Sequence, residues 1–446
     1  MRDSSKQPSN ARASVGKEKA VNVGLIGFGN IGRGVVKYFR EGHGKQFNIH
    51  LKTIAVRNIS KKRDFKIELT NTVEDIFNDP EIDIVVELIG GLDPAKKYIV
   101  QAMEKGKSVV TANKAVMARN SKELFDKARK NSVDLAFEAA VGGGIPIINT
   151  LNRYQGEKIE KVMGVLNGTT NFILTQMEAG LDFDTAVKIA QDRGFAEANH
   201  ILDTGGYDSR DKLALIASLI FNAEVNPEKI STRGIVDITP VDIDFADKYK
   251  VAEGGRGYAI KLLAIAQRRN GDVELRVGPA LLSRDHPLAS VRDEVNAVYV
   301  EGELAGPQTF SGRGAGTNPT TSAVISDILR LANNLQRGVA DELPKLDSKV
   351  SYIKSDKMKQ KGYIRANLKN KPGSLYEVAG FFARHGLNIE DSIQRGEYSY
   401  KVGKESFIPD IITFEPALTE TIEKVLIDLK KSNRVDGDPL FMSIEE

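Results

Sequence analysis

Lysine, acidic, histidine and hydroxyl side chains must carry any chemistry that this sequence performs, alone or with a bound cofactor, because it contains no cysteine. That absence excludes disulfides, thiolate nucleophiles and cysteine-ligated zinc or iron–sulfur centres. The histidines lie far apart and match no two-histidine metal spacing, so we expect no transition-metal site. They are His43, His50, His200, His286 and His385.

Two lysines stand where they could act on a substrate. Lys114 follows a predicted strand, at the edge where open α/β sheets place their ligands, although a solvated loop lysine fits the sequence equally well. Lys212 follows Asp208 by four residues, so on a helix the two side chains share one face. Read alone, that spacing would indicate a surface ion pair of little energetic worth.

Two tracts could line a site for a small ligand. In Phe137–Pro146 the single acid Glu138 stands among apolar residues and glycines, where backbone carbonyls could join its carboxylate around a cation. Alternatively, these glycines form a domain hinge. The tract Gly164–Phe172 carries small hydroxyl and amide residues, which offer either a polar lining or caps for a helix expected near Asn171.

A glycine-rich turn joins a predicted strand to a predicted helix near the start of the globular region. In its G-x-G-x-x-G spacing, Gly27 makes the tight turn, Gly29 lets the backbone approach a pyrophosphate, and Gly32 lets helix and strand pack closely. The pyrophosphate would lie on the free N–H groups of the helix. A turn without a ligand is the alternative, but the flanking strand and helix favour dinucleotide binding. The segment reads Gly27-Phe28-Gly29-Asn30-Ile31-Gly32.

The residues after the next predicted strand, Ile49–Val56, indicate which dinucleotide is preferred. NAD sites usually place an acid there, whereas this chain has Arg57-Asn58 and then Lys61-Lys62-Arg63. A guanidinium at this position can hold a 2′-phosphate, so the sequence favours NADP, with NAD possible. Arg57 is the strongest candidate, since the basic run could also be a solvated turn.

Short apolar runs alternating with helical patterns predict a doubly wound α/β sheet in residues 21–150. A second, α+β unit with a mixed sheet is expected in residues 151–335, a linker in 336–358, and a small βαββαβ unit in 359–446. The runs expected as strands of the first unit are Val21–Ile26, Ile49–Val56, Ile82–Glu87, Lys107–Thr111 and Asp134–Phe137.

Composition agrees with a protein of two or three domains. The 446 residues are 41% hydrophobic and 28% charged, with a net charge of only +3, so nucleic acid is an unexpected partner. Residues 1–20 are polar, lack the apolar core of a secretory signal and are expected to be a disordered tail. No run is long and apolar enough for a membrane helix, so we expect no membrane association and a cytoplasmic location.

Taken together, the motifs between Val21 and about Asn333 resemble the homoserine dehydrogenase family, including a later glycine-rich segment, Gly312–Gly316, that precedes Pro319-Thr320. The resemblance implies an NAD(P)-dependent enzyme that interconverts L-homoserine and L-aspartate 4-semialdehyde. It implies that Lys212 is the proton donor and acceptor, and a lysine tuned by burial and neighbouring acids suits that task. The resemblance further implies that Glu197 and Asp208 bind the substrate and that Lys114 is a second active-site lysine. Lys114 and Gly316 are also expected to contact the cofactor. A monovalent-cation site (Na or K) is implied at Glu138, Val141, Gly143 and Ile145.

The sequence departs from the family pattern in one loop. Where the family usually reads E-A-D-P, this chain has Glu197-Ala198-Asn199-His200, and Thr204 replaces the usual apolar residue after the acid. We interpret His200 as a loop substitution rather than a catalytic base.

The C-terminal unit resembles an ACT domain of ferredoxin-like fold through Tyr363–Leu368, Lys371–Leu375 and Phe381–Ile389. The resemblance implies feedback by threonine as an amino-acid effector, with an assembly module that binds nothing as the alternative. It also implies a homodimer through the second unit, or a homotetramer if the C-terminal units pair.

Two other function classes share part of this pattern. Another two-domain Rossmann oxidoreductase would share the glycine turn, but the Asn167–Asn171 stretch and the spacing of Glu197, Asp208 and Lys212 argue against it. A sensor without catalysis would combine a nucleotide-binding and an amino-acid-binding unit, and the presence of both lysines argues against that.

Overall fold

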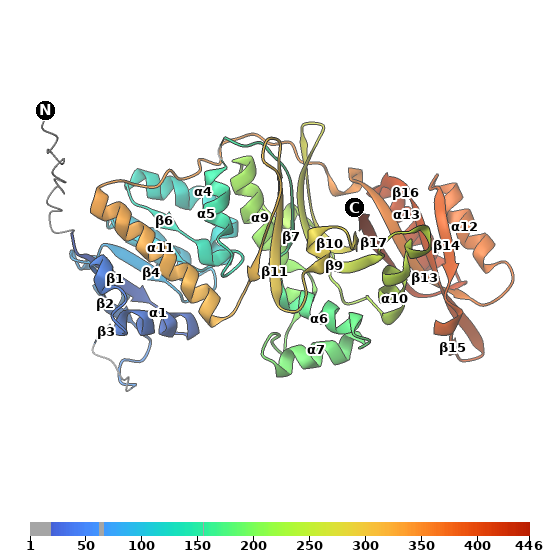
Figure 1. Cartoon of the computed structure of the whole chain (residues 1–446), viewed down its shortest axis with the longest axis horizontal. Coiled ribbons are helices and arrows are strands. Elements are labelled where there is room, and N and C mark those ends of the chain that lie inside the picture. Colours follow the sequence, from blue (N-terminus) through green and yellow to red (C-terminus); the bar gives the residue numbers. More distant parts are fainter. Residues whose placement is uncertain (1–18, 62–66, 155) are drawn as a thin grey trace, which may run out of the picture.

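The computed structural model describes residues 19–61, 67–154 and 156–446, which form three units along the long axis of the molecule (Figure 1). Residues 1–18 of the expected tail lie outside the described residues, as do Lys62 and Arg63 of the basic run. Within the described ranges, no helix combines the length and hydropathy that crossing a membrane requires.

The first unit is built on a six-stranded sheet in the order β3-β2-β1-β4-β5-β6, in which every pairing is parallel. The direction of winding reverses between β1 and β4, and the carboxyl ends of these strands are where such sheets bind ligands. The expected doubly wound sheet is confirmed. The strands are β1 Val21–Ile26, β2 Ile49–Ala55, β3 Glu68–Thr70, β4 Ile84–Glu87, β5 Ser108–Thr111 and β6 Leu135–Ala136.

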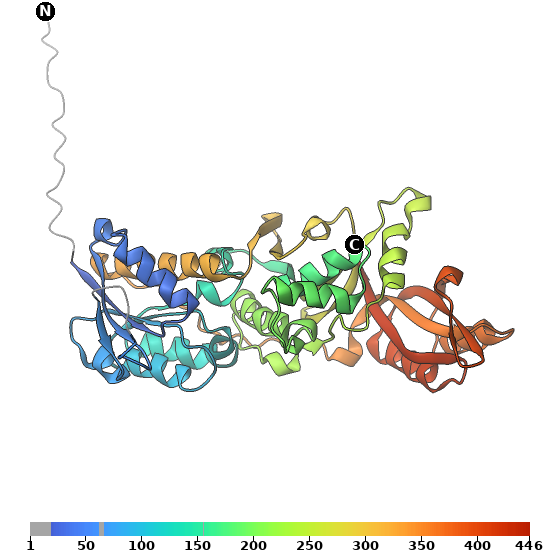
Figure 2. The same ribbon diagram turned by 90° about the horizontal axis from the view of Figure 1, so that it is seen from below.

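Helices cover both faces of the first sheet, which Figure 2 shows nearly edge-on. On one face α1 (Asn30–Arg40) packs against α11 (Thr317–Arg337), a helix from far along the chain. A Cβ on Gly34 of α1 would lie 2.3 Å from the hydroxyl of Thr321, so the two helices touch closely. The range expected for the second unit therefore includes a helix that packs on the first sheet. The other face is covered by α2 Val73–Asn78, α3 Ala95–Glu104 and α4 Lys114–Lys130.

The second unit contributes long strands to an 11-stranded sheet whose main order is β12-β11-β7-β9-β10-β17-β13-β16-β14. Both parallel and antiparallel pairings occur, so the expected mixed sheet is confirmed. Its strands are β7 Ile159–Val165, β8 Ser231–Thr232, β9 Tyr258–Arg269, β10 Asp272–Ser283, β11 Val295–Gly302 and β12 Gly306–Arg313. Its helices are α5 Ile147–Arg153, α6 Gly168–Glu178, α7 Phe183–Asp192, α8 Ile201–Thr204, α9 Tyr207–Phe221 and α10 Pro240–Lys248.

The third unit has the expected βαββαβ succession, with one extra short strand, and its sheet continues the sheet of the second unit. Its last strand, β17, pairs in parallel with β10 at Ala280–Leu282. The buried Arg276 of β10 donates to Ser443 and Glu445 of β17, which ties the two units together. The elements are β13 Lys359–Lys369, α12 Ser374–Arg384, β14 Ile389–Gln394, β15 Tyr400–Val402, β16 Glu405–Leu418, α13 Thr419–Lys431 and β17 Val435–Glu445.

The segment expected as a linker, residues 336–358, packs against both preceding units. Arg129 of α4 donates to the carbonyl of Pro344 at 2.6 Å, and Leu346 is only 2% exposed. Farther on, Tyr352 forms a bridge with Val273 of β10. The connection therefore lies against the first and second units before it enters the third.

Candidate active site

The glycine turn after β1 has the geometry that a dinucleotide needs. Gly27 has a φ of 104°, and a Cβ there would lie 2.8 Å from the carbonyl oxygen of Leu88, so only glycine fits. A Cβ on Gly32 would lie 2.4 Å from the carbonyl oxygen of Gly27. At Gly29, by contrast, no atom lies within 4 Å of a Cβ position, and no side chain caps α1. The residues present therefore fit a pyrophosphate on the N–H groups of α1.

The remaining residues expected at the cofactor come from three places around this turn. Phe28, Asn30 and Ile31 belong to the turn and the start of α1, and the hydroxyl of Thr321 on α11 lies 3.5 Å from the carbonyl of Ile31. Gly316, with a φ of 102°, is the N-cap residue of α11. Arg57 is exposed just beyond β2, at the carboxyl edge of the sheet.

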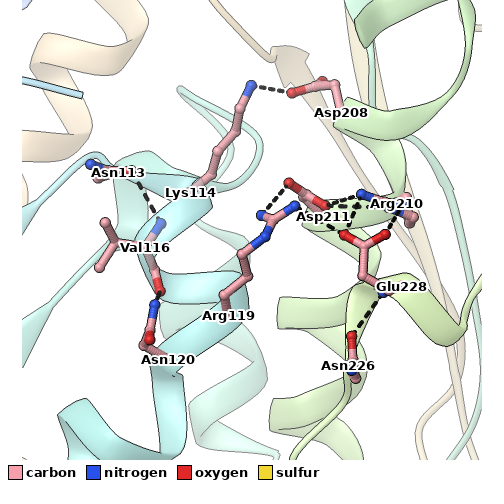
Figure 3. Close-up of polar contacts among 10 residues, drawn as sticks. All are labelled: Asn113, Lys114, Val116, Arg119, Asn120, Asp208, Arg210, Asp211, Asn226 and Glu228. Carbon is pink, nitrogen blue, oxygen red and sulfur yellow. Dashed lines mark hydrogen bonds and ion pairs between the residues drawn. The ribbon is translucent and has the colours of Figure 1, made fainter. Parts of the chain in front are cut away.

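A cluster of two lysines and one carboxylate forms where the first two units meet. The Oδ2 atom of Asp208 lies 2.7 Å from Nζ of Lys212, one turn away on α9. Its Oδ1 atom accepts a hydrogen bond from Lys114 at the start of α4. Figure 3 shows the Lys114 side chain reaching across to Asp208. The structure thus brings together Lys212, Asp208 and Lys114, which lie far apart in the sequence.

Asn167, the N-cap of α6, connects this cluster to a second carboxylate. Its Oδ1 accepts from the backbone N–H of Thr170, while its Nδ2 donates to Asp203 at 2.6 Å and to Asp208 at 2.9 Å. The amide is therefore both a helix cap and a bridge between the two acids. The structure shows the cap, one of the two alternatives that the sequence offered for this tract, and the bridge between the acids is a contact that the sequence did not predict.

Burial and the surrounding charges set the protonation of the cluster. Lys212 is 7% exposed, and its burial, with the positive charge of Lys114, lowers its pKa against the pull of Asp208. Burial alone would raise the pKa of Asp208, but the positive charges of Lys212 and Lys114 hold it below the ordinary value. Burial and the nearby Asp208 raise the pKa of Asp203. The site thus holds an ionised carboxylate beside a lysine that loses its proton more easily than usual.

A second set of ion pairs joins the same two helices beside the lysine–carboxylate contact (Figure 3). Arg119 of α4 donates to Asp211 of α9 at 2.8 Å and lies 3.3 Å from Glu228. Arg210 contacts that same Glu228 at 2.9 Å. These contacts hold α4 and α9 together next to Lys114 and Asp208. The sequence analysis missed the contacts of Arg119, since no local pattern pairs residues more than 90 positions apart.

The loop before α9 carries Glu197 and the departures from the family pattern, two of which are His200 and Thr204. Glu197 is exposed, and among the described residues its carboxylate has no hydrogen bond or ion pair. His200 is the N-cap residue of α8, and its Nδ1 lies 3.0 Å from the hydroxyl of the fully buried Thr204. The structure therefore does not bring Glu197 into the cluster. It adds Asp203, for which the sequence analysis assigned no role although its spacing from Asp208 was visible.

The expected cation residues form one buried turn between β6 and α5. Both carboxylate oxygens of Glu138 accept backbone N–H groups, from Ile148 and Asn149, each at 2.8 Å. Burial raises the pKa of Glu138 to about 7 despite these bonds. Val141, Gly143 and Ile145 follow within the same buried turn, where Gly143 has a φ of 54°. Among the described residues, no group of three or more histidine, aspartate or glutamate side chains could hold a metal ion.

The fold and the cluster together define a dinucleotide-dependent oxidoreductase. Comparison with family models agrees. Residues 27–138 match the model described as the NAD-binding domain of homoserine dehydrogenase, and residues 146–329 match the model described as homoserine dehydrogenase.

The chain belongs to the homoserine dehydrogenase family, and it is an NAD(P)-dependent oxidoreductase acting on a CH–OH group. It is 36% identical to the homoserine dehydrogenase of Bacillus subtilis, with 94% of this chain and 99% of the relative covered. The crystal structure of a homoserine dehydrogenase from Thiobacillus denitrificans has a TM-score of 0.85 at 32% identity and covers 96% of this chain and 99% of its own. A hyperthermophilic archaeal homoserine dehydrogenase in complex with NADPH has a TM-score of 0.60 at 25% identity, over 71% and 98% of the two chains.

Proposed function

We propose that the chain interconverts L-homoserine and L-aspartate 4-semialdehyde, with Lys212 transferring the proton. The observation that carries this proposal is the contact of the buried Lys212 with Asp208, which also pairs with Lys114 of the dinucleotide-binding unit. A lysine in such a setting is suited to exchange a proton with an alcohol or aldehyde oxygen.

The chemistry follows from the proton balance of the reaction. Oxidation removes a proton from the hydroxyl oxygen of homoserine and a hydride from the carbon that carries it. When bound, the nicotinamide supplies the hydride acceptor. The unprotonated Nζ of Lys212 accepts the proton, and in the reverse direction the protonated Nζ donates it to the aldehyde oxygen. The lowered pKa of Lys212 increases the unprotonated fraction at neutral pH.

Substrate binding falls to the carboxylates around this lysine. Asp208, which two ammonium groups keep ionised, receives the ammonium of homoserine, and Lys114 acts as the second active-site lysine. The resemblance adds Glu197 as a second carboxylate for that ammonium, although its exposed side chain lies outside the cluster. The family resemblance supports these roles. The contact between Lys114 and Asp208 supports them as well, because it joins the two units at the cluster.

The test is the absorbance of reduced nicotinamide with purified protein, L-homoserine and either NADP or NAD, for wild type and Lys212→Ala. We expect homoserine-dependent reduction that Lys212→Ala lowers by about a hundredfold or more. Lys122→Ala is the control for loss of a lysine outside the cluster, because Lys122 lies on α4 and pairs with Asp347. Turnover that survives in Lys212→Ala would reject the assignment of the proton-transfer residue.

NADP is the proposed coenzyme, held at its 2′-phosphate by Arg57. The exposed guanidinium beyond β2 supports this choice, and the NADPH complex of the archaeal relative is consistent with it. The resemblance assigns the rest of the molecule to Gly27–Gly32 and Gly316, and the fit of glycine at Gly27 and Gly32 supports this.

A monovalent cation is proposed in the turn of Glu138, Val141, Gly143 and Ile145, bound by backbone carbonyls next to the buried acid. The burial of Glu138 among apolar residues supports it, because a cation there would compensate the carboxylate charge. Thermal unfolding in sodium, potassium and choline chloride at equal ionic strength tests the idea. Equal midpoints in all three salts would count against the site.

The C-terminal unit is proposed as an ACT domain of ferredoxin-like fold through which threonine inhibits the enzyme. Its βαββαβ succession and the strand order β17-β13-β16-β14 support the assignment. Activity titrated with L-threonine tests the regulation, and full activity at saturating threonine would reject it. The same resemblance supports a homodimer through the second unit, or a homotetramer, which sedimentation would distinguish.

A further inference from the structure

The short segment 231–235 lies between the C-terminal unit and the loop that carries Asp203. On one side it pairs with β10: β8 runs parallel to Arg276-Val277, and the backbone N–H of Arg233 donates to the carbonyl of Val277 at 2.9 Å. On the other side, the N–H of Ile235 donates to the carbonyl of Thr204 at 2.8 Å. The segment is therefore fixed both to the sheet and to α8.

The side chain of Arg233 reaches from this segment to the C-terminal unit. Its guanidinium carbon lies 5.0 Å from the ring centroid of Phe441 on β17, within cation–π range. Its Nη2 atom lies 3.6 Å from the carboxylate of Glu423 on α13. The side chain is 37% exposed, so the guanidinium is partly shielded by the C-terminal unit that it contacts. Figure 1 shows β17 beside β10, with which it pairs in parallel.

The segment and the active-site loop pack closely, backbone against backbone. A Cβ on Gly234 would lie 2.2 Å from the carbonyl oxygen of Thr204, and a Cβ on Gly206 would lie 3.1 Å from the carbonyl oxygen of Arg233. Thr204 directly follows Asp203, and Gly206 stands two residues before Asp208. A shift of the segment must therefore displace the backbone that holds both carboxylates.

We propose that Arg233 is a positioning residue through which the C-terminal unit fixes the loop that presents Asp203 and Asp208 to the substrate. The proposal rests on the proposed function of that cluster. With Arg233 anchored on Phe441 and Glu423, the segment presses against Thr204 and keeps α8 in register with Asn167. Without the contacts of Arg233, the loop still folds, but the carboxylates of Asp203 and Asp208 sample more positions. Homoserine then binds less well, while the proton transfer itself is unchanged.

The close packing around Arg233 would pass a movement of the C-terminal unit on to the segment 231–235. The cavity at this junction, lined by Arg233, Phe441 and Thr419, measures only 30 Å³. Because the side chains at the junction already lie close together, a shift of the C-terminal unit there would also move the segment. A ligand or assembly contact that moves β17 or α13 would then change the affinity for homoserine through Arg233.

The test compares Arg233→Ala, Arg233→Lys and Phe441→Leu by steady-state kinetics with L-homoserine and NADP on the full chain. We expect Arg233→Ala to raise the KM for homoserine about fivefold, with kcat and the KM for NADP within about twofold of wild type. Arg233→Lys keeps the positive charge and should restore part of the loss. Phe441→Leu keeps the apolar packing, removes the ring face and should raise the same KM.

A double variant and a matched control separate coupling from general destabilisation. If Phe441 acts through Arg233, Phe441→Leu adds nothing further to Arg233→Ala. Arg268→Ala is the control, because Arg268 also lies 5.0 Å from a ring centroid, that of Phe221, but contacts neither the C-terminal unit nor α8. Loss of folded enzyme lowers kcat at constant KM, which differs from the expected pattern.

The proposal is overturned by a wild-type homoserine KM in Arg233→Ala, by an equal rise in Arg268→Ala, or by additive effects of Arg233→Ala and Phe441→Leu. If Arg233→Ala does not fold, Arg233→Lys and Phe441→Leu carry the same comparison. The proposed function is tested separately by Lys212→Ala. If that variant keeps its turnover, the proposed function fails, independently of the results for the Arg233 variants.

Discussion

The imidazole of His200 and the hydroxyl of Thr204 close the single turn of α8 on itself. Nδ1 of His200 lies 3.0 Å from Oγ1 of Thr204, and that hydroxyl in turn lies 3.1 Å from the carbonyl oxygen of His200. A hydroxyl has one hydrogen to donate, so Thr204 donates to the carbonyl and accepts from the imidazole N–H. Two of the positions at which this chain departs from its family's loop pattern therefore form one contact, directly beside Asp203.

Thr204→Val should cost about 1 kcal/mol of folding stability, because it leaves the imidazole N–H of His200 without its partner in a partly buried place. It should also raise the KM for homoserine a few-fold by loosening α8. Urea unfolding and steady-state kinetics measure the two effects. In the double variant Thr204→Val with His200→Leu both polar partners are gone, so its stability should return toward wild type. A single variant as stable as wild type would show that the contact has no energetic role.

The pH dependence of homoserine oxidation should report the pKa of Lys212, since the unprotonated amine is the active form. Because burial lowers this pKa, kcat/KM should rise with pH and level off below 10.5, the ordinary value for lysine. Two neighbours act with opposite signs. Asp208→Asn removes a charge that raises the pKa of Lys212 and should move the midpoint down, whereas Lys114→Gln removes a charge that lowers it and should move the midpoint up. Shifts of the same sign in both variants would contradict this electrostatic account.

Arg57 should decide the choice of coenzyme. Arg57→Ala should raise the KM for NADP about tenfold and leave the KM for NAD nearly unchanged, because only NADP carries the 2′-phosphate that the guanidinium would bind. Lys61→Ala provides a comparison from the same loop, and its effect should be smaller. Initial rates with each coenzyme at saturating homoserine measure the difference. Equal losses with both coenzymes would mean that Arg57 acts on a part that the two share.

Sequence patterns predicted the first sheet well because its strands are short, apolar and bounded by turns. The predicted ends of β1, β2 and β4 lie within two residues of those observed. The resemblance implied that the chain returns to the cofactor at Gly316, but the packing of α11 against α1 was not predicted, since it joins residues almost 300 positions apart. Nor were β9 and β10. β9 is a mostly apolar run that periodicity alone cannot tell from buried helix, and in β10 the alternation of apolar and charged residues is interrupted by Gly278-Pro279.

In the site, too, local sequence patterns predicted some features, whereas contacts between distant residues could not be predicted. The glycine turn and the spacing of Asp208 and Lys212 are local patterns, so their positions could be expected from the sequence. The contact of Lys114 with Asp208 joins two units and follows only from the fold. The continuation of the sheet from β10 into β17 has no sequence signal either, because parallel pairing between distant strands is set by tertiary packing.

The buried carboxyl of Asp410 on β16 should make the protein less stable as the pH rises. It is fully buried with a hydrogen bond from the hydroxyl of Ser392, and burial raises its pKa from 3.8 to about 6. The folded state therefore binds this proton more tightly than the unfolded chain does. Stability from this group is full below about pH 4, falls between about pH 4 and 6, and stays constant above, for a total loss of about 2–3 kcal/mol.

Asp410→Asn keeps the size and the acceptor oxygen but removes the titration. The variant should match wild type near pH 4 and exceed it in urea midpoint at pH 8, where wild type must keep a buried charge. Asp438→Asn is the matched control, because Asp438 is an exposed acid of the same unit paired with Lys430, and its replacement should change little at any pH. If Asp410→Asn were less stable than wild type at pH 8, the ionised carboxylate would be a stabilising group, contrary to the effect of its burial.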